Sequence, residues 1–175
     1  FGSGDLAQNL IVQEGLITSE PQKGKHVRQM TGKEIYDSYV VAGILEGAGV
    51  AESLPLWTEA NMETFRSVVR QMEGKISYAT KLDELAEIDE LFHATLFMAC
   101  DNTRLVEMAR TSCATISKYL YYQHWITMFT PREYADRHHA VAEAVYSRDV
   151  KHVETALRDH YKETGLRMAQ FGKEA

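Results

Sequence analysis

The 175-residue sequence predicts an all-α, antiparallel helical bundle. Three observations support this fold class. From Thr31 onward, apolar residues recur at helical spacing. Thr-x-x-Glu capping boxes at Thr31 and Thr130 mark two helix starts. The segment 87–102 is apolar along two stripes, which indicates a central helix covered on more than one side. With 45% hydrophobic and 25% charged residues, the chain has the composition of a soluble globular domain with one moderate core.

The first thirty residues have a different pattern. Residues 5–14 have helical spacing, and Gly15 is a helix stop before a strand-like segment at 16–18. A turn with Gly24 at its tip, flanked by cations, then leads into a second short strand, which predicts a basic hairpin. Its charge alone fits an ordinary solvated hairpin, and contact with nucleic acid is the alternative.

The remaining elements follow from periodicity and from start and stop signals. Glycines 43, 47 and 49 in the first bundle helix indicate close backbone packing, or a break before Pro55. Asn102 is expected to end the central helix, and Asp149 to cap the last one. Helices are expected at 31–46, 58–72, 87–102, 104–129, 130–147 and 149–171.

The central helix carries an acid and a histidine on one face. Asp89 and His93 are four residues apart, so their side chains project in the same direction one turn apart. Burying an unpaired carboxylate costs several kcal/mol, and a metal ion is a partner that suits both groups. Cys100, two turns beyond His93, is either a soft extra ligand or a buried structural thiol.

Two further histidines point into the predicted core. His138 and His160 share helix faces with apolar residues, whereas His139 and His152 share faces with polar ones and are expected to be solvated. His138 and His160 are equidistant from Asp149, so they should meet across an antiparallel helical hairpin.

Together, Asp89, His93, His138 and His160 form a nitrogen-rich set inside the bundle. The set suits zinc or nickel, with manganese or iron as alternatives, and disfavours magnesium and calcium. Two other interpretations remain open. The four residues can form a purely structural polar cluster, or the site can belong to a metalloenzyme that activates water or oxygen. The enzyme would need a further acid or base, and the sequence offers no compelling candidate.

Charge and hydropathy exclude several other classes. The formal net charge of −6 argues against a chain that coats nucleic acid along its whole surface. No apolar run approaches the roughly 18 uncharged residues of a membrane span, and no signal peptide is recognisable. Two cysteines within helical patterns fit reduced thiols. The expected compartment is therefore the cytoplasm.

Several segments of the sequence resemble those of a known protein family. The pattern Asp89-x-x-x-His93, the segment 100–102, the run from Arg137 to Val145 with Asp149, and His160 resemble the FCD effector-binding domain of FadR-subfamily GntR transcription regulators. The resemblance covers about 32–171 and implies a bundle of six or seven helices in residues 31–175. It also implies a homodimer, a divalent metal held by the four residues, a small carboxylate effector beside it, and no enzymatic activity.

Residues 13–17 and 21–27 resemble the end of the recognition helix and the wing of the family's winged helix-turn-helix. The resemblance therefore implies that residues 1–30 are the C-terminal part of that domain and that the parent protein binds operator DNA. The arginine expected early in the recognition helix has no counterpart near Gly4-Asp5, and the preceding helices are absent from the sequence. DNA contacts are implied for Lys23, Gly24, Lys25 and Arg28.

The first bundle helix departs from the family pattern. Many members carry an arginine shortly before a Leu-Glu pair, where it can hold an effector carboxylate. Here the segment 40–43 precedes Ile44-Leu45-Glu46, so that cation is lost. Lys118 stands roughly where the family often has an arginine on the long helix, and it lacks the bidentate fork of arginine. Effector contacts are therefore expected from Lys118, Tyr122 and His124.

Overall fold

The computed structural model of the chain describes residues 17–20 and 24–174. The helix expected at 5–14 and its stop at Gly15 lie outside these residues. β1 (Ile17–Glu20) and β2 (Gly24–Val27) pair in antiparallel register, with Ile17 opposite Val27, as the predicted hairpin requires. Gly24 does not stand at the tip of the turn but begins β2 opposite Glu20.

The rest of the described chain is helical, and the all-α fold class is confirmed. Seven α-helices and three short 3-10 or π-helical turns occur in the described residues. In chain order they are α2 (Gly32–Ser53), η1 (Leu54–Leu56), α3 (Glu59–Ile76), η2 (Leu82–Leu85), α4 (Ala86–Leu96), α5 (Thr103–Ser112), η3 (Ile116–Leu120), α6 (Tyr122–Trp125), α7 (Pro131–Ser147) and α8 (Val150–Ala169).

Both predicted capping boxes are formed. Thr31 accepts a hydrogen bond from the Glu34 amide at 3.2 Å, and the Glu34 carboxylate accepts one from the Thr31 amide at 2.8 Å. Thr130 and Glu133 repeat the arrangement at the start of α7. Each box satisfies backbone N–H groups that a helix start leaves unpaired. The sequence therefore predicted the starts of α2 and α7 correctly.

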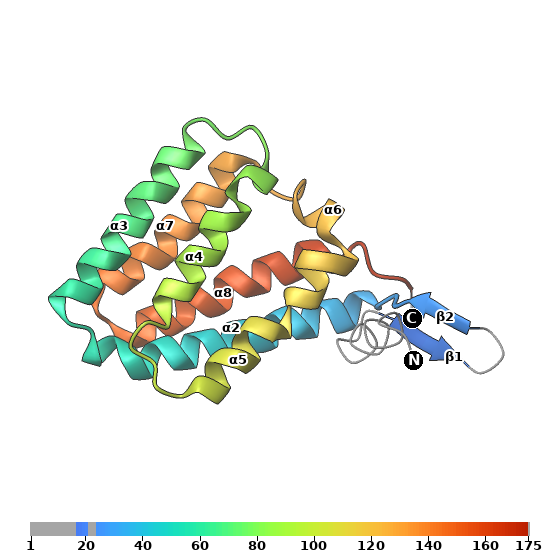
Figure 1. The fold of residues 1–175 in the computed structure, drawn as a ribbon, viewed down its shortest axis with the longest axis horizontal. Coiled ribbons are helices and arrows are strands. Elements are labelled where there is room, and N and C mark those ends of the chain that lie inside the picture. Colours follow the sequence, from blue (N-terminus) through green and yellow to red (C-terminus); the bar gives the residue numbers. More distant parts are fainter. Residues whose placement is uncertain (1–16, 21–23, 175) are drawn as a thin grey trace, which may run out of the picture.

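The helices form a compact bundle with α2 and α8 antiparallel and side by side, while α3, α4 and α7 pack together and α5 lies along α2 (Figure 1). The main core fills the space among these helices and includes Phe65, Phe92, Leu96, Val145 and Leu157. A smaller core joins the start of α2, the end of α8 and η3. The hairpin projects from the end of the bundle where Thr31 pairs with Lys173.

Glycine allows α2 and α8 to approach closely. A Cβ atom on Gly43 would lie 2.8 Å from Cβ of Tyr161 and 3.3 Å from Cα of Arg158. Of the two predicted roles for the glycines, close backbone packing is therefore the one seen at Gly43. The helix continues through the glycines to Ser53, and Pro55 lies in the short turn η1 that follows.

The predicted end of the central helix is wrong. α4 ends at Leu96, and Asn102 instead begins the next helix, because its side chain accepts a hydrogen bond from the Leu105 amide at 3.1 Å. Asparagine is favoured at both helix ends, so its presence alone did not distinguish a stop from a start. Leu91 on α4 is 42% exposed, so one part of the predicted apolar stripe faces solvent.

The prediction of one long helix at 104–129 is also wrong. The segment is divided into α5, the π-helical turn η3 and the short α6. Around the breaks, hydroxyl groups bond back to the helix backbone: Ser112 donates to the Met108 carbonyl at 2.6 Å and Ser117 to the Cys113 carbonyl at 3.2 Å. Such bonds compete with regular helix geometry. Met108 in α5 is 46% exposed, so the apolar pattern of this segment is not wholly buried.

Among the described residues, one helical stretch, Gly32–Leu56, is long and apolar enough to cross a membrane by length and composition. Half of its most apolar part is buried within the bundle. It also carries the buried acid Glu46, which makes polar contacts with α4 and α8. These features are those of the core helix of a globular domain.

Candidate metal centre

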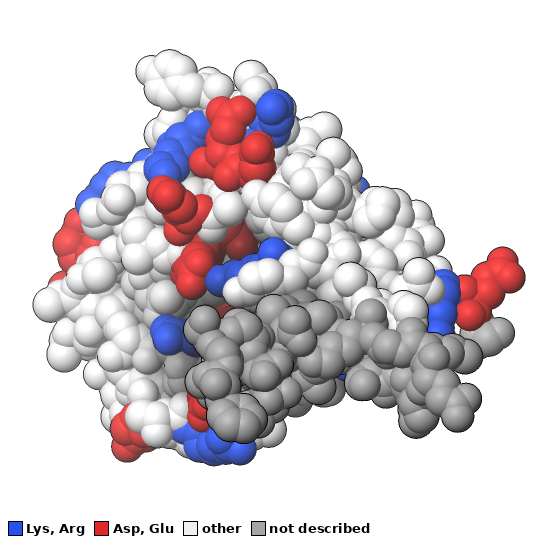
Figure 2. Space-filling model, turned by 45° about the vertical axis from the view of Figure 1, so that its right-hand side comes forward, with Lys and Arg blue, Asp and Glu red and all other residues white. Residues whose placement is uncertain are grey.

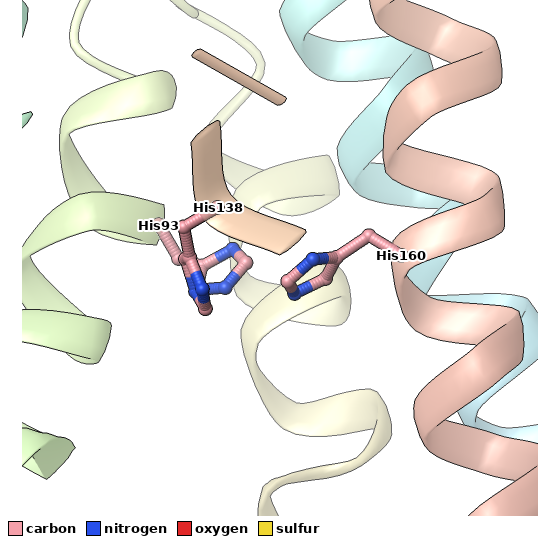
Figure 3. Close-up of side chains that lie close together, drawn as sticks. All are labelled: His93, His138 and His160. Carbon is pink, nitrogen blue, oxygen red and sulfur yellow. The ribbon is translucent and has the colours of Figure 1, made fainter. Parts of the chain in front are cut away.

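Three helices bring the four predicted ligands together. α4 supplies Asp89 and His93, α7 supplies His138, and α8 supplies His160, and the three imidazoles point toward one another (Figure 3). One nitrogen from each histidine can be chosen so that all three lie within 4.8 Å of one another. Oδ1 of Asp89 lies 3.1 Å from Nε2 of His138 and 4.0 Å from Nε2 of His93.

The hairpin of α7 and α8 sets two of these positions. Arg148 adopts a left-handed conformation with φ of 55°, which ends α7. Asp149 then caps α8 by accepting hydrogen bonds from the amides of Lys151 and His152 at 2.9 and 3.2 Å. The two helices return antiparallel, and the rings of His138 and His160 lie 4.8 Å apart, as the equal spacing from Asp149 predicted.

Hydrogen bonds orient two of the imidazoles. Nδ1 of His138 lies 2.8 Å from the Tyr134 carbonyl oxygen and donates to it, so Nε2 is the nitrogen that can accept. Nδ1 of His93 lies 2.6 Å from Oε1 of Glu46, which turns Nε2 toward Asp89. A histidine that ligates a metal usually donates its other N–H to a carboxylate or a backbone carbonyl in this way.

Two buried nitrogens in the cluster have no hydrogen-bond partner within the described part of the chain. They are Nδ1 of His160 and Nε2 of His138, and the latter has Oδ1 of Asp89 at 3.1 Å without the geometry of a hydrogen bond. A buried polar atom without a partner costs about 1–3 kcal/mol. Together with the Asp89 carboxylate, these nitrogens form the kind of donor set that binds zinc, nickel, manganese or iron. The residues therefore fit a divalent metal.

The protonation states of three of the four groups, Asp89, His138 and His160, also suit a cation. Burial lowers the pKa of His138 and, with the positive charge of Arg137 nearby, lowers that of His160 well below its ordinary value. Burial alone would raise the pKa of the Asp89 carboxyl, but the adjacent imidazoles of His138 and His93 lower it. At neutral pH the site thus offers two neutral imidazoles and an ionised carboxylate.

Glu46 is a site residue that sequence reasoning missed. It is 3% exposed, and its carboxylate contacts His93 through Oε1 and accepts a hydrogen bond from the Tyr161 hydroxyl at 2.7 Å through Oε2. Burial opposes protonation of His93, but the Glu46 charge and hydrogen bond raise its pKa to about 9. The available signal was the single acid in the apolar stretch 38–51 of α2.

A cavity of about 270 Å³ adjoins the four residues. One side is formed by α4, α7 and α8, and the other by α5, η3 and α6, with Tyr39 and Glu46 contributed by α2. Polar or charged residues that line it beside the cluster include Tyr39, Glu46, Glu90, Ser117, Lys118 and Arg137. Cys113 also lines it, and burial raises the pKa of this thiol to about 12, whereas Cys100 lies outside the histidine cluster.

Two of the three predicted effector contacts lie at the cavity and one does not. Lys118 and Tyr122 line the cavity. His124 does not line it and instead stacks on Phe171 with ring centroids 4.0 Å apart. Nζ of Lys118 lies 2.9 Å from Oε2 of Glu90, so an ion pair joins η3 to α4 at the cavity.

The predicted DNA contacts lie in or near the hairpin. Gly24 and Lys25 are in β2, whereas Lys23 lies outside the described residues. Arg28 follows β2, and its guanidinium is 3.5 Å from the Glu34 carboxylate at the start of α2. Acidic and basic side chains are interspersed over the described part of the face shown in Figure 2.

The fold and the site define a class: an all-α bundle with an internal cavity beside a cluster of three histidines and an acid. Residues 37–163 match the FCD domain family. The chain therefore belongs to the FCD domain family.

Two curated relatives are transcriptional regulators. The HTH-type transcriptional repressor RspR of Escherichia coli K12 is 23% identical over 167 residues, which cover 94% of this chain and 71% of the relative. The Nta operon transcriptional regulator of Aminobacter aminovorans is 25% identical over 134 residues, covering 75% of this chain and 60% of the relative. These relatives are regulators rather than enzymes.

Solved structures share the fold. McbR/YncC of E. coli aligns with a TM-score of 0.75 at 14% identity, covering 94% of this chain and 78% of that one. A GntR family member from Pseudomonas syringae pv. tomato aligns with a TM-score of 0.63 at 18% identity, covering 94% and 68%. At these identities the likeness concerns the fold.

Proposed function

We propose that this chain is the effector-sensing part of a cytoplasmic, homodimeric transcription regulator of the FadR subfamily of GntR proteins. In this proposal residues 31–175 bind the effector, and residues 1–30 belong to a winged helix-turn-helix that contacts operator DNA. The observation that carries the proposal is the convergence of Asp89, His93, His138 and His160 beside a cavity. Family membership supports a regulatory role for such a cavity.

The four residues would hold one divalent metal, with zinc or nickel favoured over manganese or iron. The unpartnered nitrogens of His138 and His160 support this assignment. When bound, the ion would supply a Lewis-acid anchor for the carboxylate of a small organic acid. Glu46 and the Tyr134 carbonyl would keep His93 and His138 turned toward it.

An effector in the cavity would contact residues from both sides of it, including Lys118 and Tyr122 of the irregular segment. Binding would change the packing of α5, η3 and α6 against the rest of the bundle. Only an effector with different affinities for two arrangements of the dimer can shift the equilibrium between them. The proposed regulation therefore requires that the cavity differ between the DNA-binding and DNA-free forms.

The metal assignment is tested by mass spectrometry on protein purified without a metal-affinity step, with melting temperatures recorded before and after chelation. The expected result is about one divalent ion per chain and a lower melting temperature after chelation, because a ligand that binds only the folded state stabilises it. Failure to bind zinc, nickel or manganese, even when each is supplied, would reduce the cluster to a structural polar core.

The regulatory part needs a separate test. In operator-binding assays with a protein that carries the complete winged helix-turn-helix, His138→Ala should remove the effect of a small carboxylate on DNA affinity, while DNA binding without the effector persists. His139→Ala is the matched control, because His139 pairs with Glu73 at 3.2 Å and lies outside the cavity. Regulation that persists unchanged in His138→Ala would contradict the proposal.

A further inference from the structure

Arg137 is a largely buried cation in the wall of the cavity. It stands on α7 directly before His138, and its side chain is 12% exposed. It lines the same cavity as Asp89, His138 and His160. We infer that Arg137 binds the carboxylate of the effector and supplies the charge that the first bundle helix lacks. This inference rests on the proposed effector site and adds a binding residue to it.

The guanidinium group is held in place on several sides. Nε donates to Oε2 of Glu163 at 2.8 Å, and Nη2 donates to the His160 carbonyl and to the Thr164 hydroxyl. Its central carbon lies 4.0 Å from the centre of the Phe129 ring. Nη1 makes no hydrogen bond to any described residue. A fixed guanidinium with free N–H groups is well suited to recognise a carboxylate, because little conformational entropy remains to be lost.

The other cationic side chains that line the cavity are less suitable for binding the effector carboxylate. Lys118 is half exposed and Arg110 is exposed, whereas the Arg137 side chain is 12% exposed. α2 contributes Tyr39 and Glu46 to the cavity wall and no cation, while Ala42 is fully buried in the core. Among the described cations that line the cavity, Arg137 is therefore the one most protected from solvent screening.

The other residues that line the cavity indicate the chemical nature of the rest of the ligand. Several aromatic rings line the cavity, from α2, α6, the segment after α6 and α7: Tyr39, Tyr122, Trp125, Phe129 and Tyr134. The hydroxyl groups of Tyr39 and Tyr134 are buried, with Ser117 and Asp89 as their polar neighbours and no hydrogen bond of good geometry to a described residue, so they can serve a polar group on a ligand. The structure assigns to this cavity an organic carboxylate with an apolar or aromatic body.

Arg167 provides a matched control for Arg137. It also pairs with Glu163, at 3.1 Å, and also stacks on Phe129, at 4.3 Å, but it does not line the cavity. Arg137→Met and Arg167→Met both remove an ion pair with Glu163 and a contact with Phe129. Only Arg137→Met removes a cation from the cavity, together with the hydrogen bonds to the His160 carbonyl and Thr164. Benzoate serves as the anionic probe and benzamide as its neutral counterpart, each titrated by NMR into wild-type and variant proteins loaded with zinc.

Arg137→Met should weaken benzoate binding by about tenfold or more, since hydrogen bonds to charged groups are among the strong ones. Arg167→Met should leave benzoate affinity nearly unchanged, and benzamide should bind both variants like wild type. Arg137→Lys, which keeps the charge and loses the hydrogen bonds that fix the guanidinium, should lie between wild type and Arg137→Met. It replaces the methionine variant if that variant fails to fold.

Three outcomes would overturn the inference. They are equal benzoate affinity in Arg137→Met and wild type, equal losses in the Arg137 and Arg167 variants, and no benzoate binding to wild type in the millimolar range. The zinc content of every sample is measured separately. Absence of zinc would count against the proposed metal centre alone, because the loss of benzoate affinity in Arg137→Met is expected in metal-free protein as well.

Discussion

The two sides of the cavity are built differently. The side formed by α4, α7 and α8, here called the histidine wall, is tied together by contacts between helices. Examples are the Glu46 bridge from His93 to Tyr161 and the ion pair of Arg137 with Glu163. The opposite side, formed by α5, η3 and α6 and here called the irregular wall, contains a π-helical turn and two interrupted helices.

The difference indicates that the two walls have different roles. A metal site requires ligands fixed in position by their neighbours, which the histidine wall provides. π-helical turns are frequent at functional sites, and Lys118 lies within this one. The irregular wall is joined to the histidine wall by the ion pair of Lys118 with Glu90. We therefore expect substitutions in the histidine wall to have larger effects than those in the irregular wall.

The largest effect is expected from His138→Ala. This residue is 1% exposed and supplies one of the two unpartnered nitrogens. Zinc affinity should fall by more than about 100-fold, because even supporting residues around a metal are typically worth 10–100-fold. Competition titration with a chromogenic chelator measures the loss. His139→Ala should bind zinc like wild type, and a similar loss in both variants would contradict the assigned site.

Glu46→Gln should weaken zinc binding by roughly 10–100-fold, the range typical of groups that orient a metal ligand. The amide can still accept a hydrogen bond from His93 but no longer carries the charge. Glu52→Gln is the control, because Glu52 is an exposed acid on the same helix. Wild-type zinc affinity in Glu46→Gln would show that Glu46 does not support the metal centre.

The same contact predicts a pH dependence in the metal-free protein. His93 has a pKa of about 9 in the folded state against an ordinary value of 6.5. Its charged pairing with Glu46 therefore stabilises the fold fully below about pH 6.5, and this contribution is lost as the pH rises through 9. Its size is on the order of 3 kcal/mol.

Urea unfolding of wild type and Glu46→Gln across this pH range measures that contribution. The difference in free energy of unfolding should be largest at the acidic end and should narrow toward the alkaline end. A difference that stays constant with pH would mean that Glu46 acts through packing alone. Zinc should reduce the pH dependence, because a bound metal requires neutral His93 at every pH.

Two glycines of α2 allow the tightness of packing on the two sides of the cavity to be compared directly. Gly43 faces α8, where an added Cβ would meet Cβ of Tyr161 and Cα of Arg158. Gly49 faces the start of α5, where the nearest atoms are Cδ2 of Leu105 at 2.6 Å and Cε1 of Phe97 at 2.8 Å. Backbone and Cβ atoms move less easily than the far ends of side chains.

Gly43→Ala should therefore lower the free energy of unfolding by about 1–3 kcal/mol, the usual cost of overpacking. In Gly49→Ala the side chains can shift, and the gain in helix propensity of about 1 kcal/mol offsets much of the strain. Thermal or urea unfolding of both variants measures the difference. A larger loss in Gly49→Ala would show that the irregular wall is as tightly packed as the histidine wall.

The histidine wall was predictable because its geometry follows from local rules. The spacing of Asp89 and His93, the capping box at Thr130 and the equal spacing of His138 and His160 from Asp149 each have a fixed structural consequence. These rules placed the three histidines correctly relative to one another before any tertiary contact was known.

The irregular wall and Glu46 were not predictable in the same way. The apolar pattern from 104 to 129 is continuous, so the breaks around η3 depend on hydroxyl bonds and packing that leave no periodic signal. Glu46 meets a histidine 47 residues away through a contact between α2 and α4. Such a pairing is tertiary, and a lone acid in an apolar helix does not identify its partner.

The smallest effect is expected at the junction of the two sides, in Glu90→Gln. The ion pair of Glu90 with Lys118 is well exposed, so its loss should change stability by less than about 0.5 kcal/mol. It should nevertheless free Lys118 for an anionic ligand and raise benzoate affinity about twofold at low salt, an effect that salt screens.

Glu87→Gln is the matched control for Glu90→Gln. Glu87 lies on the same helix as Glu90, pairs with Lys75 of α3 at 3.6 Å and does not line the cavity. NMR titrations with benzoate at low and high salt distinguish the two variants. If Glu90→Gln and Glu87→Gln bind benzoate equally at both salt concentrations, Lys118 makes no contact with the anion. Recognition of the carboxylate would then depend on the histidine wall alone.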